Sequence, residues 1–279
     1  MKLPPFLQQL MRRRIVMVSA IVLLVIAVFA IGAPWFAAAD PNDTAVLDRL
    51  KPPSAEHLLG TDELGRDLYA RIVHGARYSL AIAALTAIGS VALGTLIGLV
   101  AGFFRRLDAP LMRVVDAMMS FPDILLAIAL VAILGPSLLN VVLALVLVYT
   151  PRVARVVRGS TLVVRELLFV EAVRALGART PHILWHHILP NLMSPILVQA
   201  SFIFAYAILA EAGLSFLGVG VPPEIPTWGT MVAGSQQYMH KAYWVVLFPG
   251  LAIIATALSL QLLGDGVRDS LDPKLKKAA

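Results

Sequence analysis

The segment EAVRALGARTPHILWHHILP, residues 171–190, separates two long apolar runs of the chain. Good helix formers fill residues 165–176, and Gly177 follows them, where a left-handed C-cap is easiest for glycine. Thr180 and Pro181 then predict a new helix, with threonine as the N-cap and proline at the first helical position. This second helix is expected to reach Leu189 and to be interrupted by Pro190, which has no backbone N–H. The sequence therefore predicts two short helices outside the lipid, joined by a bend.

Two uses of this helix pair fit its composition. Ala172, Leu176 and Ala178 stand beside charged residues, which suits insertion into a groove on a partner protein. An amphipathic helix that lies on the membrane surface has a similar composition. The residues by themselves leave both interpretations open.

Six apolar runs dominate the rest of the chain and predict membrane-spanning helices. A span needs about 20 apolar residues, because the hydrocarbon core is about 30 Å thick and each residue rises about 1.5 Å. Only 14% of the residues are charged and the mean hydropathy is +0.82, so lipid is the expected main solvent and an all-α integral membrane protein the expected fold class. The expected spans are 15–33, 78–104, 121–134 with a start nearer Arg113, 138–150 with a continuation past Pro151, 192–210 and 243–263.

The lysines and arginines predict the orientation of these spans. With the N-terminus in the cytoplasm, 17 of the 23 Lys and Arg residues fall in cytoplasmic segments and 6 fall outside. Cytoplasmic loops carry such an excess, so both termini are expected in the cytoplasm. The same distribution explains the net charge of +6 without a nucleic-acid partner. The first span is too long for the apolar core of a signal peptide and is interpreted as an uncleaved anchor.

The first outside segment, residues 34–77, carries a mixed-charge run, GTDELGRD, at residues 60–67. A solvated cap over the helix ends is one interpretation of this run. The other is a contact surface for an external partner, with Asp62 and Arg66 as the candidate contacts.

The second outside segment, residues 211–242, contains the stretch VGVPPEIPTWG, whose three prolines exclude a regular helix there. Glu211 lies near the outer end of the fifth span. An ionisable group at membrane depth is expensive and usually faces a cavity or a partner. Glu211 is therefore expected either to accept hydrogen bonds from neighbouring helix ends or to line a pathway. An aromatic belt at the membrane interface is expected from Trp228, Tyr243 and Trp244.

The fourth span is expected to extend into the cytoplasm as a helix with a basic stripe. Arginine recurs at every third position, Arg152, Arg155 and Arg158, with apolar residues between. Such arginines are suited to pairing with anionic lipid headgroups.

Catalytic and metal chemistry find little support in the residues. His182 and His186 have the i, i+4 spacing of a zinc pair, but HILWH lacks the glutamate of His-Glu-x-x-His and no third ligand is evident. The chain has no cysteine, and GLSFL at residues 213–217 lacks the last glycine of the Gly-x-Ser-x-Gly motif. We therefore expect no catalytic residue and no metal site. An ion-driven secondary carrier is disfavoured, because Asp123 and Glu211 lie near span ends rather than at the bilayer midplane.

Several motifs together resemble one family. Glu171 and Ala172, then Gly177, then Leu189 and Pro190 have the spacing of the EAA loop of ABC-transporter permeases, at about residues 160–191. Across residues 58–275 the chain is similar to the C-type permease subunit of dipeptide, oligopeptide and nickel importers. The other runs that carry the resemblance are GTDELGRD (60–67), MRVVDAMMSFP (112–122), EAGLSFLGVGVPPEIPTWG (211–229) and GDGVRDSLDPKL (264–275).

The resemblance implies the permease fold of type I ABC importers, with six transmembrane helices. It implies an N-terminal anchor and outside segment over residues 1–77, a core of five spans over residues 78–270 and a cytoplasmic tail over residues 271–279. The implied coupling residues are Glu171, Ala172, Arg174, Leu176, Gly177, Leu189 and Pro190.

The implied activity is transport across the bacterial inner membrane. The chain would form half of a pathway for short peptides, with nickel, opines or glutathione as alternative cargo. The implied partners are a similar second permease, two ATP-binding subunits and an extracytoplasmic substrate-binding protein. ATP and magnesium would be bound by the ATPases, since the chain lacks the phosphate-binding loop Gly-x4-Gly-Lys-Ser/Thr.

Overall fold

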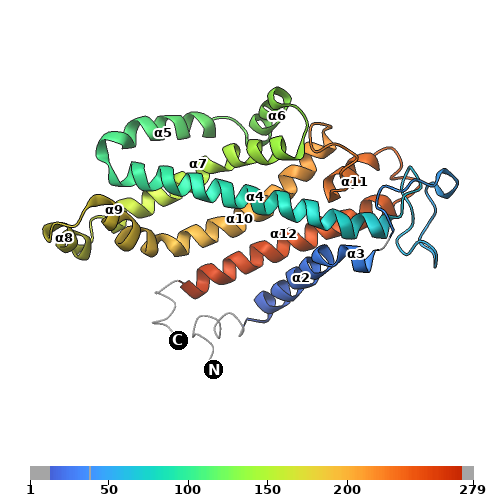
Figure 1. The fold of residues 1–279 in the computed structure, drawn as a ribbon, viewed down its shortest axis with the longest axis horizontal. Coiled ribbons are helices and arrows are strands. Elements are labelled where there is room, and N and C mark those ends of the chain that lie inside the picture. Colours follow the sequence, from blue (N-terminus) through green and yellow to red (C-terminus); the bar gives the residue numbers. More distant parts are fainter. Residues whose placement is uncertain (1–12, 38, 272–279) are drawn as a thin grey trace.

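The computed structural model describes residues 13–37 and 39–271, which form a bundle of long helices with no β-strand among them (Figure 1). Short helical pieces sit at both ends of the bundle: α8 and α9 at one end, and α3 and α11 at the other. The long helices are α2 (Arg14–Ile31), α4 (Leu68–Phe103), α5 (Arg105–Met119), α6 (Asp123–Leu134), α7 (Leu138–Val164), α10 (Met193–Phe216) and α12 (Trp244–Leu271). The short elements are α3 (Ala33–Phe36), η1 (Val46–Asp48), α8 (Leu168–Ala175), α9 (Thr180–His182), η2 (Ile183–Ile188), η3 (Leu189–Leu192) and α11 (Trp228–Gly234).

The number of predicted spans is confirmed. Five helical segments of the described chain are long and apolar enough to cross a membrane, and the bent pair α5–α6 makes a sixth. Helix α7 continues through Pro151 into the arginine-rich stretch, as predicted. Helix α4 begins at Leu68, well before residue 78, because the Asp67 side chain caps it by accepting a hydrogen bond from the Ala70 N–H at 2.9 Å. The predicted boundary at residue 77 therefore lies inside a helix.

The third span differs from the prediction. A helix that starts near Arg113 and continues through residue 121 was expected, but the chain turns by 92° between α5 and α6. Pro122 explains the break, since proline disfavours helical backbone at the preceding residue, here Phe121, and cannot donate to the helix ladder. Helix α5 runs along the bundle, whereas α6 turns away from that direction (Figure 1).

The prediction that Trp228 and Trp244 belong to an aromatic belt at the membrane interface is also wrong. Trp228 and Trp244 are buried in a cluster that links α4, α11 and α12. The Trp228 indole N–H donates to the carbonyl of Ile72 at 3.1 Å, and that of Trp244 donates to the carbonyl of Thr61. Of the three predicted belt residues, Tyr243 alone is exposed. The outer ends of the spans are thus covered by protein, because α11 folds back against them.

Helices α4 and α7 pack side by side through glycines on α4 (Figure 1). A Cβ atom on Gly94 would lie 2.8 Å from the carbonyl oxygen of Thr150, and one on Gly98 would lie 2.6 Å from that of Ala154. Lipid supplies no hydrophobic force between helices, so close backbone approach through small residues is the main source of their association. These glycines therefore set the distance between the two helices.

We expect Gly98→Ala to destabilise the protein, because the added methyl group meets the backbone of α7 and no rotamer change can move a carbonyl. Overpacking of this kind costs about 1–3 kcal/mol, partly offset by the better helix propensity of alanine. Thermal unfolding of the purified protein in detergent measures the effect as a lower Tm. Gly250→Ala in α12 is the matched control, since nothing lies within 4 Å of its Cβ position. Equal Tm values for both variants would contradict this account of the helix contact.

Candidate functional site: the cytoplasmic segment and the charged contacts of the bundle

The predicted helix pair is present at the end of the bundle where α4 and α10 also end (Figure 1). Helix α8 ends at Ala175, and Gly177 follows with a φ of +81°, the left-handed conformation expected for it. Helix α9 begins at Thr180 with Arg179 as the N-cap, one residue before the N-cap predicted. Nothing within 4 Å would contact a Cβ on Gly177, so the glycine is required by the backbone and not by crowding.

The second helix does not end at Pro190, in contrast to the prediction. The helical path continues from α9 through the π-helix η2 and the 3-10 turn η3 into α10. Pro190 lies in the first turn of η3. Backbone N–H groups in the first turn of a helix have no acceptor within that helix, so proline causes no loss of a hydrogen bond there. The wider π-helix η2 and the tighter 3-10 turn η3 accommodate the proline. The segment from Thr180 to Phe216 is therefore one connected helical path.

Buried and polar contacts fasten this segment to the bundle. Val170, Ile183 and Ile188 are buried in the main core. The Arg165 guanidinium donates to the carbonyl of Gly102 at 2.5 Å, and the Arg174 guanidinium lies 5.6 Å from the centre of the Phe103 ring. The segment is thereby tied to the cytoplasmic end of α4 as well as to α10.

Most of the predicted coupling residues face outward. Leu176 is 87% exposed and Leu168, which was not predicted, is 82% exposed. Leu189 is half-buried. The other exposed members of the predicted set are Glu171, Ala172, Arg174, Gly177 and Pro190. The structure therefore presents these side chains on one projecting unit, together with the exposed Trp185.

The arginine stripe of α7 pairs with aspartates of α5 and α6. Arg158 forms a two-point ion pair with Asp108, and Arg155 Nη2 lies 2.5 Å from Asp116 Oδ1. Arg152 pairs with Asp123, the first residue of α6. Sequence reasoning assigned the arginines to lipid headgroups and missed the aspartates. The signal was the spacing of Asp108 and Asp116, which lie eight residues apart and so share a face of α5, whereas Asp123 begins α6 after the break.

A cavity of about 220 Å³ lies between α6, α7 and α10. Asp123, Tyr149 and Tyr206 supply its polar groups, and the rest of the lining is apolar. Arg152 Nη2 donates to Asp123 Oδ2 at 3.0 Å, and its guanidinium lies 5.1 Å from the centre of the Tyr206 ring. The sequence did not predict that Tyr149 and Tyr206 line the same cavity, because this depends on the packing of α6, α7 and α10 against one another.

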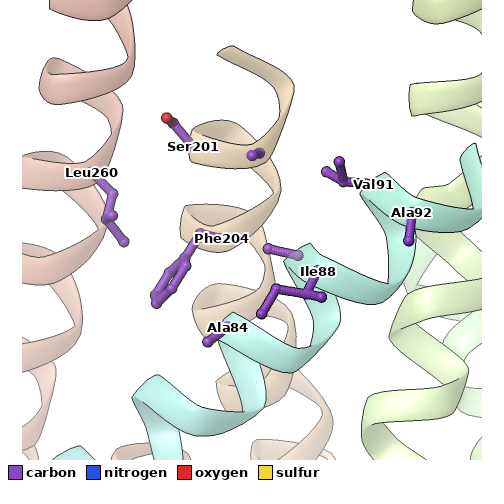
Figure 2. A pocket seen from close by; sticks show the side chains of 9 residues that line it. Ala84, Ile88, Val91, Ala92, Ser201, Phe204 and Leu260 are labelled. Carbon is purple, nitrogen blue, oxygen red and sulfur yellow. The ribbon is translucent and has the colours of Figure 1, made fainter. Parts of the chain in front are cut away.

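A larger hollow of about 550 Å³ lies between α4, α10 and α12 (Figure 2). Figure 2 shows alanine and aliphatic side chains around it, with Phe204 pointing toward the helix that carries Leu260. Ser201 is its one hydroxyl residue, and that hydroxyl donates to the carbonyl of Leu197 at 3.1 Å in its own helix. This hollow offers hydrocarbon contact and no free polar group.

The mixed-charge run of the first outside segment is an internal ion network. Asp62 is 4% exposed and accepts hydrogen bonds from the N–H groups of Leu64 and Arg66 and from Arg66 Nε. Burial raises the pKa of the neighbouring Glu63 carboxyl above its usual value, and the Asp62 charge adds to the rise. Asp62 is thus a structural residue of this turn, and contact between this face and an external protein stays a prediction.

Glu211 is also buried, with 2% of its surface exposed. Its Oε1 accepts hydrogen bonds from Ser215 Oγ at 2.9 Å and from Thr227 Oγ1 at 2.7 Å. A Cβ on Gly229 would lie 2.8 Å from both carboxylate oxygens. The carboxyl group therefore joins the end of α10 to the start of α11, which is the structural alternative among the two predicted roles.

No group of three or more His, Asp or Glu side chains that could hold a metal ion occurs within residues 13–37 and 39–271. The His182 and His186 rings stack on each other, with centroids 4.4 Å apart.

Together, the membrane bundle and its projecting helical segment define a transport permease of the type I ABC importer fold. A structure of the MetNI methionine ABC transporter in an inward-facing conformation matches with a TM-score of 0.61, covering 74% of this chain and 98% of that one at 19% identity. The chain belongs to the family of binding-protein-dependent transport system inner membrane components, whose model matches residues 93–277. The model for the N-terminal TM domain of oligopeptide transport permease C matches residues 6–53.

Relatives cover nearly the whole chain. A Brucella suis protein whose name assigns it to a peptide transport system as a permease is 51% identical, over 96% of this chain and 91% of its own length. The di/tripeptide transport system permease protein of Pseudomonas aeruginosa is 46% identical, over 92% of this chain and 87% of its own. The dipeptide transport system permease protein of Alkalihalophilus pseudofirmus is 44% identical, over 96% and 89%.

For Glu211 we expect Glu211→Ala to lower the stability of the protein, because the hydroxyls of Ser215 and Thr227 lose their buried acceptor. An unpaired buried polar group costs about 1–3 kcal/mol. Glu211→Gln keeps one carbonyl oxygen and should be milder in a thermal unfolding measurement. If instead Glu211→Gln keeps the wild-type Tm but abolishes transport, the carboxylate acts in the pathway and the structural assignment is wrong.

Proposed function

We propose that this chain is one of two permease subunits of an ATP-driven importer of short peptides in the bacterial inner membrane. Family membership supports the importer, and the names of the Pseudomonas and Alkalihalophilus relatives support di- and tripeptides as cargo. A second permease completes the pathway, and a binding protein outside the membrane delivers the peptide. Two ATPase subunits bind ATP and magnesium and hydrolyse the nucleotide, while this chain is not catalytic.

The observation that carries the proposal is the mechanical connection of the cytoplasmic segment. Helix α8 lies beyond the ends of α4 and α10, along the long axis of the bundle (Figure 1). The path from Thr180 into α10 is continuous, and Arg165 ties the same unit to Gly102 of α4. A displacement of α8 by an ATPase therefore moves both helices.

The exposed apolar side chains of this unit favour a protein partner over the membrane surface. Leu168, Leu176 and Trp185 are exposed at the end of the bundle, next to the charges of Glu171 and Arg174. Large apolar side chains exposed beside charged residues are typical of a protein contact. Because the unit projects beyond the spans, a groove on an ATPase can enclose it.

The relatives support short peptides as the cargo class, but they do not limit the cargo to one kind of short peptide. A glutathione transport system permease protein of Pectobacterium atrosepticum is 41% identical over 97% of this chain. Glutathione is itself a short peptide, so a pathway for short peptides accommodates both kinds of relative.

For coupling, we expect Gly177→Ala to reduce peptide uptake and binding-protein-stimulated ATP hydrolysis by the assembled complex. The left-handed backbone at this position costs an alanine roughly 1–2 kcal/mol, which shifts the direction of α8 relative to α9. Glu171→Lys should weaken ATPase association through reversal of an exposed charge. Gly159→Ala is the matched control, since its Cβ position is equally free of neighbours and lies inside α7 without a positive φ. Normal uptake and normal stimulation in both test variants would exclude the proposed coupling role.

A further inference from the structure

The cavity between α6, α7 and α10 combines an aspartate, two tyrosines and an arginine at its edge. Arg152 contacts three lining residues: its Nη2 donates to Asp123, and its guanidinium lies 5.9 Å and 5.1 Å from the ring centres of Tyr149 and Tyr206. The arginine therefore stands at the edge of the hollow, where both its charge and that of Asp123 are adjacent to the space within.

This ion pair is partly exposed and is not saturated by hydrogen bonds. The side chains of Arg152 and Asp123 are 38% and 49% exposed. Within the described chain, the single hydrogen bond of Arg152 to protein uses Nη2, and Asp123 Oδ1 accepts none. By comparison, Arg158 presents two nitrogens to the two carboxylate oxygens of Asp108. Arg152 thus keeps unused N–H donors and Asp123 an unused oxygen.

The location of this pair differs from that of its two neighbours. The contacts of Arg155 and Arg158 with Asp116 and Asp108 fasten α5 to α7, whereas the pair of Arg152 and Asp123 joins α6 to α7 beside the cavity. Charged groups along spanning helices are costly and mark substrate or ion pathways. Of these three pairs, that of Arg152 and Asp123 borders a cavity, so its free donors and its free oxygen lie beside that space.

We propose that Arg152 and Asp123 form a subsite for the two charged ends of a short peptide in transit. Arg152 binds the terminal carboxylate through its unused N–H donors, and Asp123 Oδ1 accepts a hydrogen bond from the terminal ammonium group. The faces of Tyr149 and Tyr206 contact the peptide backbone and side chains. This subsite rests on the proposed function, because it assumes peptides as cargo.

The size of the cavity fits part of a ligand. Pockets that enclose a whole small molecule measure about 300–1,000 Å³, whereas this cavity measures about 220 Å³. The cavity therefore accommodates part of a short peptide, while the two charged ends of that peptide contact Arg152 and Asp123 at its edge. Partial enclosure suits conduction, since a substrate must also leave the site.

The test uses the complete transporter in proteoliposomes, with a dipeptide, the same dipeptide as its C-terminal amide and its N-acetyl form. The measured quantity is the ratio of uptake rates for free and blocked peptide. The binding protein contributes the same preference in every variant, so a change in this ratio belongs to the permease. Arg155→Gln is the matched control, because it removes a neighbouring arginine that lines no part of the cavity.

We expect Arg152→Gln to lower the free-to-amide ratio about tenfold, the value of one lost charge-assisted hydrogen bond. Asp123→Asn should lower the free-to-acetyl ratio similarly, and Arg155→Gln should change neither ratio. Arg152→Lys retains the charge and should keep part of the preference, which also controls for assembly. Unchanged ratios in Arg152→Gln, or an equal change in Arg155→Gln, would overturn the subsite. A wild-type complex that transports none of the peptides would instead refute the proposed function.

Discussion

The close approach of α4 to α7 is the contact on which the other features depend. Gly94 and Gly98 bring the two backbones together where any larger residue would meet a carbonyl group. Because lipid tails are as apolar as leucine, this fit replaces the hydrophobic force that joins helices in water. It also fixes the cytoplasmic ends of both helices, so that the Gly102 carbonyl lies within reach of Arg165. The attachment of the projecting helical segment to α4 therefore follows from the packing of α4 against α7.

The bent pair α5–α6 is held to this frame by a different kind of force. Met112 and Val115 are the buried residues of α5, and most of its other side chains are exposed or half-exposed. Its attachment to α7 depends instead on ion pairs, of which the contact of Arg158 with Asp108 has the best geometry. Partly exposed ion pairs contribute less than packed cores. Helix α5 is accordingly joined to α7 more loosely than α6 is, since Ala127 and Val131 of α6 are buried in the main core.

Sequence reasoning reached the spans and the left-handed glycine at residue 177, because each depends on local composition or a single backbone requirement. It did not give the 92° turn before Asp123, since apolar periodicity shows that a helix exists but not where it points. Trp228 was assigned to the membrane interface because its burial depends on α11 folding back onto α4. The partners of the arginine stripe required the antiparallel alignment of α5 with α7. The predictions that succeeded depend on local sequence, whereas those that failed depend on how distant segments pack together.

The two charged contacts outside the main core differ in a way that bears on transport. Asp62 is saturated by hydrogen bonds and buried, so its charge serves the turn that contains it. The pair of Arg152 and Asp123 is unsaturated and joins α6 to α7 beside a cavity that α10 also lines. Tyr206 lies on α10, which continues from the projecting helical segment, whereas Tyr149 lies on α7, which the glycines hold against α4. A movement of α10 relative to α7 would change the distance between the two tyrosines, and with it the width of the cavity.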